Sequence, residues 1–185
     1  MKRFEVKDIN TPEYWNTHQT ATDFGLRQQK YKELAGRGNF ILDAGCGLSP
    51  FLNGVGNNFK YKWGLDYSPK TIEECKKLYP ECFFLRGDVT NMPFLENSFD
   101  VVVCGEVIEH LEDYKKLVSE MARVATRRII ISTPKLEIDE PEHLWEFDEA
   151  DLLQLLKPYG APGVESIKSE RFPGRQYMFA WCDLK

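Results

Sequence analysis

Several residues of this chain have the types and spacing of a ligand-binding site. Residues 41–47 (ILDAGCG) are an apolar run that ends in two glycines, Gly45 and Gly47. Glycines in such a turn let the backbone approach a ligand closely, because no Cβ intervenes. Asp66 lies 23 residues after Asp43, at the end of the next apolar run. Its two acceptor oxygens suit the two hydroxyls of a ribose.

Two more groups of this kind follow later apolar runs. In residues 86–94 (RGDVTNMPF), Asp88 can accept a hydrogen bond from an exocyclic amine, and the backbone N–H beside it can donate to a ring nitrogen. Met92 and Phe94 could then cover a flat base. The fourth group begins in the buried run 99–104 and opens at Gly105. All four groups end predicted strands, where open α/β sheets bind their ligands.

Candidate acids and bases lie just after Gly105. Glu106, Glu109 and His110 stand at i, i+3 and i+4, so a helix would place them on one face. One interpretation is a packing and capping motif at a helix start. A second makes His110 or His143 a general base, with Glu106 beside it. A third makes Glu106, Glu109, His110 and His143 a divalent metal site, although hard cations prefer a richer oxygen set.

The elements that position these residues alternate along the chain, which is typical of a parallel sheet with crossover helices. Strands are predicted at residues 39–46, 61–66, 82–88, 99–104 and 127–133. Helices are predicted at residues 11–36, 50–57, 69–79, 106–124 and 148–158. Two final strands, 164–171 and 176–183, are joined by a short hairpin connection. The expected fold is α/β, a three-layer doubly wound sheet of seven mostly parallel strands with a C-terminal antiparallel β-hairpin.

Taken together, the motifs resemble those of class I, Rossmann-like S-adenosylmethionine-dependent methyltransferases of the small-molecule type. The resemblance runs from about residue 14 to residue 181. Its most recognisable stretches are ILDAGCG, WGLDYSP, GDVTNMPF, SFDVVVCGEVIEHLED and HLWEFDEADLLQLL. It implies S-adenosyl-L-methionine as cofactor and S-adenosyl-L-homocysteine as product. An electrophilic methyl group needs an aligned nucleophile, so positioning can supply much of the catalysis.

The resemblance also implies which residues bind the cofactor. Gly45, Cys46 and Gly47 would line its methionine part, in a loop shaped by Asp43. Asp66 would hold the ribose with Tyr67 beside the adenine, and Asp88 and Val89 would read the adenine edge. Gly105 and Glu106 would border the methionine moiety and face the acceptor. Many members of the family have a third glycine where this chain has Ser49, which weakens the match of the glycine loop slightly.

Three rival functions remain open. A metal-assisted RNA 2′-O-methyltransferase-like enzyme is suggested by the Glu and His pattern, since metal-dependent branches of the family carry a similar one. An NAD-dependent oxidoreductase shares the glycine turn and Asp66, but Pro50 stands where GxGxxG needs its third glycine. A non-catalytic relic that still binds the cofactor is the third rival.

Composition and charge limit the kinds of partner that this chain is expected to bind. The 185 residues suit one domain, 1–185, whose helical segment 1–38 is a candidate lid. The net charge of −5 comes from residues 135–151, which carry −7, leaving +2 elsewhere. Without a clustered basic face, we expect a small-molecule acceptor rather than nucleic acid.

The chain shows neither a membrane-length apolar run nor an apolar signal segment. Its five cysteines lack metal-binding spacing. We therefore expect a cytoplasmic enzyme, with a homodimer as an open alternative.

Overall fold

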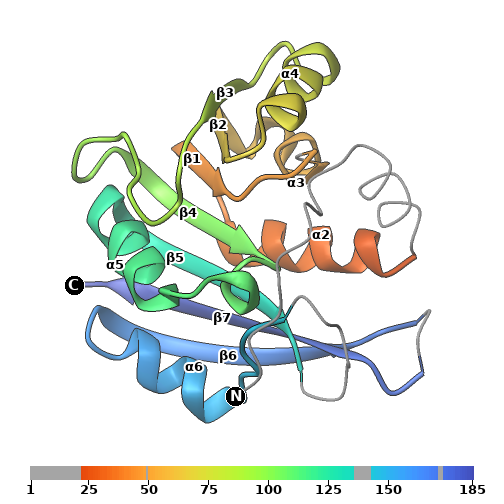
Figure 1. The fold of residues 1–185 in the computed structure, drawn as a ribbon, viewed down its shortest axis with the longest axis vertical. Coiled ribbons are helices and arrows are strands. Elements are labelled where there is room, and N and C mark those ends of the chain that lie inside the picture. Colours follow the sequence, from red (N-terminus) through yellow and green to blue (C-terminus); the bar gives the residue numbers. More distant parts are fainter. Residues whose placement is uncertain (1–21, 49, 136–142, 171–172) are drawn as a thin grey trace.

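The computed structural model describes residues 22–48, 50–135, 143–170 and 173–185. These residues form one seven-stranded sheet in the order β3-β2-β1-β4-β5-β7-β6 (Figure 1). The strands are β1 (Gly38–Ala44), β2 (Phe59–Asp66), β3 (Phe83–Arg86), β4 (Phe99–Gly105), β5 (Ala125–Pro134), β6 (Gly160–Lys168) and β7 (Gln176–Leu184). The predicted fold is confirmed, with small shifts at strand ends.

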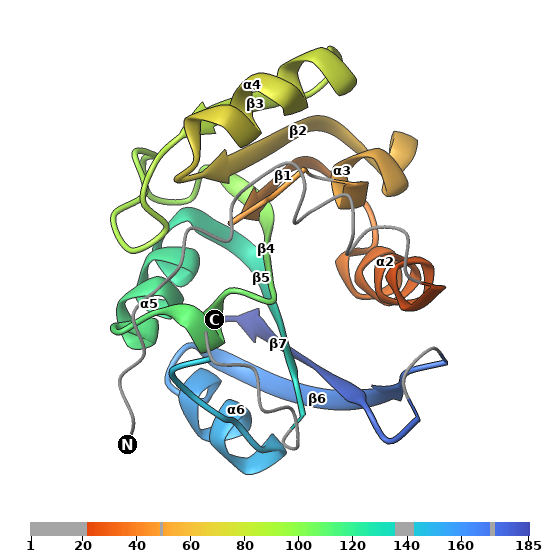
Figure 2. The same cartoon turned by 45° about the vertical axis from the view of Figure 1, so that its right-hand side comes forward.

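Helices cover both faces of the sheet, which makes three layers. They are α2 (Thr22–Ala35), α3 (Pro50–Gly54), α4 (Pro69–Leu78), α5 (Tyr114–Val124) and α6 (Glu149–Leu156), with short 3-10 turns η1 (Gly56–Asn58) and η2 (Ile108–His110). Figure 2 shows α2, α3 and α4 on one side of the sheet and α5 and α6 on the other. Among the described residues, no helix has both the length and the hydropathy needed to cross a bilayer.

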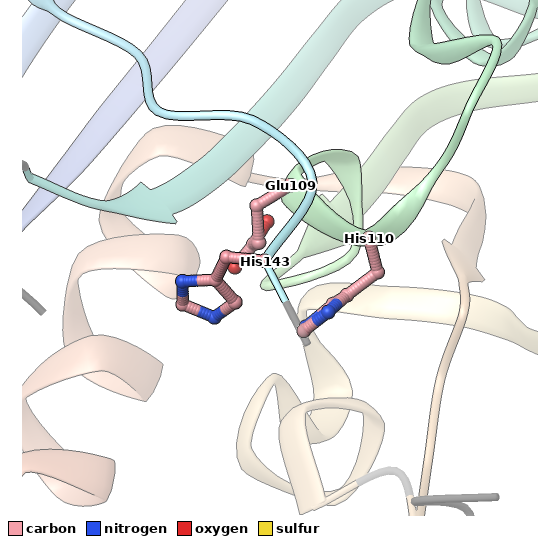
Figure 3. Close-up of side chains that lie close together, drawn as sticks. All are labelled: Glu109, His110 and His143. Atoms are coloured by element: carbon pink, nitrogen blue, oxygen red, sulfur yellow. The ribbon is translucent and has the colours of Figure 1, made fainter. Parts of the chain in front are cut away.

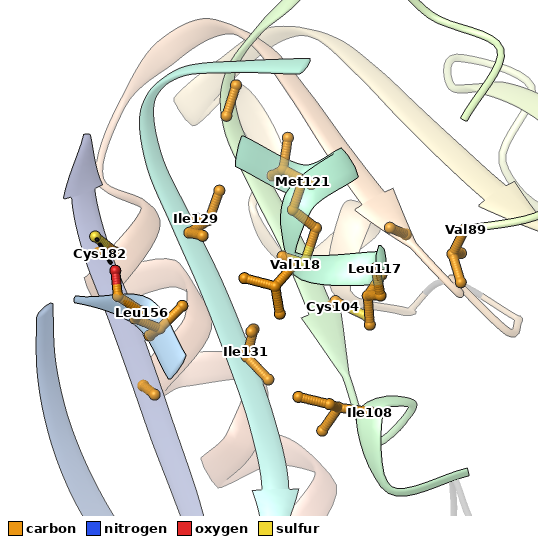
Figure 4. Close-up of a cluster of buried hydrophobic side chains, with 14 of the residues drawn as sticks. Val89, Cys104, Ile108, Leu117, Val118, Met121, Ile129, Ile131, Leu156 and Cys182 are labelled. Atoms are coloured by element: carbon orange, nitrogen blue, oxygen red, sulfur yellow. Dashed lines mark hydrogen bonds between the residues drawn. The ribbon is translucent and has the colours of Figure 1, made fainter. Parts of the chain in front are cut away.

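The two faces of the sheet bury separate hydrophobic clusters. On the α5 and α6 side, Ile129 and Ile131 of β5 pack with Leu117 and Met121 of α5 (Figure 4). On the other side, Ile130 of β5 belongs to a second cluster that also contains residues of α2, α3 and α4. This alternation along β5 follows from the pleat of a strand, which sends successive side chains to opposite faces. Burial on both faces explains the nearly continuous apolar runs of the central strands.

The predicted terminal hairpin is present and sets the end of the sheet. β7 lies antiparallel between β5 and β6, with Ile130 opposite Trp181 and Val164 opposite Ala180. The β1–β2, β1–β4, β2–β3 and β4–β5 pairs are all parallel. The carboxyl ends of these strands therefore lie at one edge of the sheet, which is the edge that carries the predicted site residues.

The predicted helix 106–124 is wrong in its first third. Glu106 has a left-handed backbone with φ +55°, a conformation that a helix cannot contain. A 3-10 turn follows at Ile108–His110, and α5 starts only at Tyr114, with the Asp113 side chain accepting the Lys116 N–H as N-cap. Glu106, Glu109 and His110 therefore do not share a helix face.

A pair of side chains on α5 holds the connection between β3 and β4, which contains no helix. Arg123 donates from Nη1 to the Phe94 carbonyl at 2.8 Å and from Nη2 to the Met92 carbonyl at 3.0 Å. Glu120 accepts the Met92 N–H at 2.8 Å and pairs with Arg123 at 2.7 Å. These bonds keep residues 92–94 in place, just after the predicted adenine-binding residues.

Two arginines of β5 fasten the carboxyl end of α2. Arg128 donates to the Leu34 carbonyl at 2.6 Å, and Arg127 donates to the Ala35 carbonyl at 2.9 Å. Arginine donors satisfy carbonyls that a helix end leaves open. The chain then turns at Gly36, φ +66°, where the sequence predicted the helix to break. The predicted start of this helix and the candidate lid before Thr22 lie outside the described residues.

Candidate active site

The turn after β1 has the backbone geometry that its glycines predict. Gly45 and Gly47 have φ values of +76° and +49°. The N–H groups of Gly45 and Cys46 both donate to the Leu65 carbonyl, at 2.8 and 3.0 Å, which ties the turn to the end of β2. A Cβ at residue 45 would lie 2.6 Å from Cγ2 of Val107. Glycine is therefore required at this position on two grounds, backbone conformation and space. Ser49 lies outside the described residues.

Asp66 is joined directly to that turn. Its Oδ2 accepts the Gly47 N–H at 3.0 Å, and its Oδ1 accepts the Ser68 N–H at 2.9 Å. Burial raises the pKa of the Asp66 carboxyl, and the backbone hydrogen bonds from Ser68, Gly47 and Tyr67 oppose that rise. Each carboxylate oxygen has a second lone pair beyond its backbone bond. The site can therefore offer two further acceptor positions, which is what a ribose diol needs.

The predicted adenine-binding residues lie beside Asp66 in differing environments. Tyr67 is 68 % exposed, and the Arg86 guanidinium lies 5.5 Å from its ring centre. Asp88 is exposed and accepts both the N–H and the hydroxyl of Thr90 at 2.8 Å, while Val89 is buried. An exposed aromatic ring and an exposed carboxylate at neighbouring strand ends are compatible with a bound base.

Met92 and Phe94, which the sequence suggested as covers for a base, both contact the hydrophobic core. Met92 is buried in the core. Phe94 packs edge-on against Phe99, with ring centres 4.9 Å apart, and also contacts Trp63. Met92 is therefore part of the core and not free to cover a base, whereas Phe94 is half-buried against that core, and its role toward a base stays a prediction.

Two thiols lie under the glycine turn. Cys75 of α4 donates from Sγ to the Gly47 carbonyl at 3.1 Å, and Cys46 is buried next to it. Burial raises the pKa of the Cys46 thiol, with contributions from Cys75 and Asp43. Asp43 is itself only 6 % exposed at the end of β1. Buried, protonated thiols of this kind are inert, so Cys46 shapes the loop through packing.

The Glu106 side chain, just after β4, belongs to a cluster of polar side chains that the sequence did not reveal. Ser132 of β5 donates from Oγ to Glu106 Oε1 at 2.5 Å, and Arg27 of α2 pairs with Oε2 at 3.4 Å. The Tyr31 hydroxyl, one helical turn after Arg27, bonds the Ser132 hydroxyl. Gly105 makes this possible, because a Cβ there would clash with the Tyr31 hydroxyl. The only signal in the sequence was the i, i+4 spacing of Arg27 and Tyr31.

The other acid and base candidates form a separate cluster. One ligand atom each from Glu109, His110 and His143 lie within 4.8 Å of one another (Figure 3). The His110 and His143 rings meet edge to face, with centres 4.9 Å apart. The Leu144 N–H donates to the Glu109 carbonyl at 2.8 Å, which brings the segment after β5 onto η2. Glu106 is not part of this cluster, so the metal interpretation, one of the three left open by the sequence, is reduced from four residues to three.

The order of the sheet, with antiparallel β7 between β5 and β6, and the glycine turn after β1 define the methyltransferase type of α/β fold. Residues 42–128 match the family described as "Methyltransferase domain". A probable S-adenosylmethionine-dependent methyltransferase of Mycolicibacterium smegmatis is 32 % identical over 149 residues, covering 74 % of this chain and 58 % of that protein. A probable tocopherol O-methyltransferase of rice is 31 % identical over 124 residues, covering 62 % and 34 %.

A solved structure shows the same fold at low sequence identity. The N-methyltransferase NodS from Bradyrhizobium japonicum, in complex with S-adenosylhomocysteine, superposes with a TM-score of 0.77 at 15 % identity, covering 94 % of this chain and 93 % of that one. The domain match and the relatives support a class I S-adenosylmethionine-dependent methyltransferase, and the solved structure shows the same fold. It spans about half the length of the first curated relatives, between 46 % and 58 %.

Proposed function

We propose that this chain transfers the methyl group of S-adenosylmethionine to an O, N or C atom of a small molecule. The observation that carries this proposal is the unit made by the Gly47 backbone and the Asp66 carboxylate. It places a close-approach glycine turn and a diol acceptor 3.0 Å apart at the carboxyl edge of the sheet. That pairing is the one a ribose-containing cofactor requires, and the match to the methyltransferase family favours S-adenosylmethionine over a dinucleotide.

The residues present fit this cofactor. The two second lone pairs of Asp66 can accept the ribose hydroxyls, and the exposed Tyr67 ring can lie against the adenine. The turn at Gly45 and Gly47 has left-handed backbone and no Cβ on either residue, so its backbone can border the methionine part. When bound, the cofactor supplies an electrophilic methyl group on sulfonium sulfur. The protein then has to bind, orient and exclude water, and can also accept a proton from the acceptor.

A small-molecule acceptor is supported by charge and by the relatives. The net charge is −5 and residues 135–151 are strongly acidic, a balance that does not favour binding to a phosphate backbone. Relatives are named for acting on tocopherol, norajmaline and ajmaline. We propose an acceptor of comparable size, and we place the protein in a reducing compartment such as the cytoplasm, since its five cysteines are free and buried.

Calorimetry separates this proposal from its rivals. Titration with S-adenosylhomocysteine should give saturable heat, and titration with NAD should give none. Heat with NAD alone would overturn the proposal in favour of an oxidoreductase. With methyl-labelled S-adenosylmethionine, a panel of phenols, amines and activated carbon acids should yield a labelled product. Tight cofactor binding with no transfer to any acceptor class would instead support a non-catalytic relic.

A second candidate is metal-assisted transfer, and the cluster of Glu109, His110 and His143 is the observation that favours it. Two imidazoles and one carboxylate fit Mn²⁺, Fe²⁺ or Zn²⁺ better than Mg²⁺, which prefers oxygen ligands. Such an ion could hold an acceptor hydroxyl, as an RNA 2′-O-methyltransferase-like enzyme would need. Activity that disappears with EDTA and returns with Mn²⁺ would establish this candidate. Activity that survives EDTA would leave His110 or His143 as a metal-free base or as packing.

A further inference from the structure

We propose that Glu106 accepts the acceptor's proton during methyl transfer and that Tyr31 and Ser132 are the residues that position its carboxylate. This inference deepens the proposed function and rests on it. Three elements contribute: Tyr31 from α2, Ser132 from β5 and Glu106 from the end of β4. They meet at the same strand edge as the Gly47–Asp66 unit, because β1, β4 and β5 run parallel.

The hydrogen bonds between these residues have only one consistent direction. An ionised Glu106 carboxylate can only accept hydrogen bonds. The single hydroxyl hydrogen of Ser132 must therefore be donated to Glu106 Oε1, at 2.5 Å. Tyr31 must then donate to the Ser132 oxygen. Burial, reinforced by the charge of Glu106, raises the pKa of the Tyr31 hydroxyl, so this donor stays protonated. Two buried donors in series thus orient one carboxylate.

The two oxygens of Glu106 differ in what surrounds them. Oε1 faces Ser132, which is fully buried, and the chain of hydroxyls behind it. The Glu106 side chain keeps 21 % of its surface exposed, and Oε2 meets Arg27 at 3.4 Å, a loose ion pair. An arriving acceptor can replace Arg27 at Oε2 without disturbing the bond at Oε1. One oxygen is therefore held while the other remains available for chemistry.

The backbone of Glu106 supports the same assignment. A left-handed φ of +55° on a glutamate is uncommon. Residues held in sparsely populated conformations cluster at active sites, because the surrounding structure must compensate for them. The strand-like bond from the Glu106 N–H to the Ser132 carbonyl, at 3.0 Å, and the side-chain bond to the same serine provide that compensation.

The proposed step conserves atoms and charge. As the new bond forms between the acceptor oxygen or nitrogen and the methyl carbon, the bond between sulfur and that carbon breaks. Its electron pair stays on sulfur, which becomes a neutral thioether. The O–H or N–H proton of the acceptor passes to Oε2 of Glu106. The neutral carboxyl group later returns this proton to solvent, and Arg27 pairs again with the carboxylate.

The inference can be tested without knowing the acceptor. Sinefungin carries a protonated amine where S-adenosylmethionine carries its methyl sulfonium, whereas S-adenosylhomocysteine carries neither. A carboxylate beside the transferring methyl group should bind the amine by a charge-assisted hydrogen bond. In Glu106→Gln, calorimetry should show sinefungin affinity falling by about 10-fold, the factor that corresponds to ~1.4 kcal/mol. S-adenosylhomocysteine affinity should change by less than about 3-fold.

Variants of the positioning residues complete the test. Ser132→Ala and Tyr31→Phe should each lower the preference for sinefungin, and Ser132→Thr, which keeps the hydroxyl, should restore it. Glu96→Gln and Tyr61→Phe, on the exposed β3–β4 connection and on β2, serve as matched controls and should leave the preference unchanged. Thermal unfolding of each variant shows whether folding is intact.

The outcomes separate this inference from the function on which it rests. If Glu106→Gln binds both ligands as the wild type does, Glu106 is not beside the methyl group and the inference fails, while the cofactor assignment stands. If the wild type binds neither ligand, the proposed function fails first. With an acceptor in hand, Glu106→Gln should lower kcat more than it changes KM, and an unchanged kcat would contradict proton transfer to Glu106.

Discussion

The Gly47 N–H donates to Asp66 Oδ2 at 3.0 Å, so the turn after β1 and the carboxylate at the end of β2 behave as one structural unit. Neither residue can move without disturbing the other, because the Asp66 carboxylate is only slightly exposed and Oδ1 is held by Ser68. The ribose acceptor is thereby oriented before any ligand arrives. Such preorganisation lowers the entropy cost of binding.

Replacing Asp66 by asparagine should therefore weaken cofactor binding strongly. The amide keeps the size of the side chain but replaces one acceptor oxygen with an NH2 donor, which can accept neither the Gly47 N–H nor a ribose hydroxyl. We expect affinity for S-adenosylhomocysteine to fall by at least about 10-fold, corresponding to ~1.4 kcal/mol or more, by calorimetry. Glu81→Gln, on the surface after α4, is the control. Unchanged affinity in Asp66→Asn would remove Asp66 from the ribose site.

Cofactor affinity should also depend on pH through Asp66. Burial raises the pKa of this carboxyl above its usual 3.8, and ribose hydroxyls favour the ionised form that accepts their hydrogen bonds. Affinity should therefore fall as pH drops through the raised pKa. In the ligand-free protein, the pH dependence of stability has the opposite sign. The stability that the Asp66 carboxyl contributes is fully present below pH 3.8 and is lost as pH rises through its folded-state pKa. Affinity that stays flat from neutral pH to pH 4 would contradict this expectation.

Gly45→Ala should disturb both the turn and the residue after Glu106. The left-handed φ of +76° costs an L-residue about 1–2 kcal/mol, and the new methyl group would press on Val107 at 2.6 Å. We expect Tm to fall by several degrees and S-adenosylhomocysteine binding to weaken. Gly174→Ala, which has φ +90° but nothing within 4 Å, isolates the backbone term. Equal losses in both variants would mean that the contact with Val107 contributes nothing.

Arg123→Ala should loosen the connection between β3 and β4. It removes two hydrogen bonds to the Phe94 and Met92 carbonyls and the pair with Glu120, at a cost of about 1.5–3 kcal/mol. The Arg123 guanidinium lowers the pKa of Glu120, so the wild type should lose this contribution as pH falls below about the usual 4.5. A pH-independent difference in Tm between variant and wild type would refute the coupling. Lys115→Ala, at the exposed start of α5, is the control.

The arrangement of strands could be predicted because each strand leaves a local signature. Ile129–Ile131 reads as a doubly buried strand, and Pro173-Gly174 marks the hairpin that forces β7 to run antiparallel. The glycine turn and Asp66 were placed correctly for the same reason, since backbone conformation and strand ends are local properties. The structure confirms their positions, while their roles toward the cofactor stay predictions, as does the homodimer.

The failures have a common physical origin. The helix expected from Glu106 onward was inferred from periodicity, which cannot show that the backbone turns left-handed at that residue. The contacts of Glu106 with Ser132 and Arg27 join residues far apart in sequence. Such contacts depend on where α2 lies on the sheet, which the hydrogen bonds from Arg127 and Arg128 to its last carbonyls help to set. No local sequence pattern predicts those hydrogen bonds.

The place of β7 in the sheet also has a consequence for when the protein can fold. Within the described part of the chain, β6 pairs with β7 alone, and β5 pairs with β4 on one side and with β7 on the other. During synthesis, residues 125–134 therefore emerge well before their second partner strand. Until residues 176–184 have left the ribosome, β5 presents an open apolar edge of the kind that promotes aggregation. The half of the sheet that holds the glycine turn and Asp66 can form early, whereas Ser132, and with it the orientation of Glu106, is secured last.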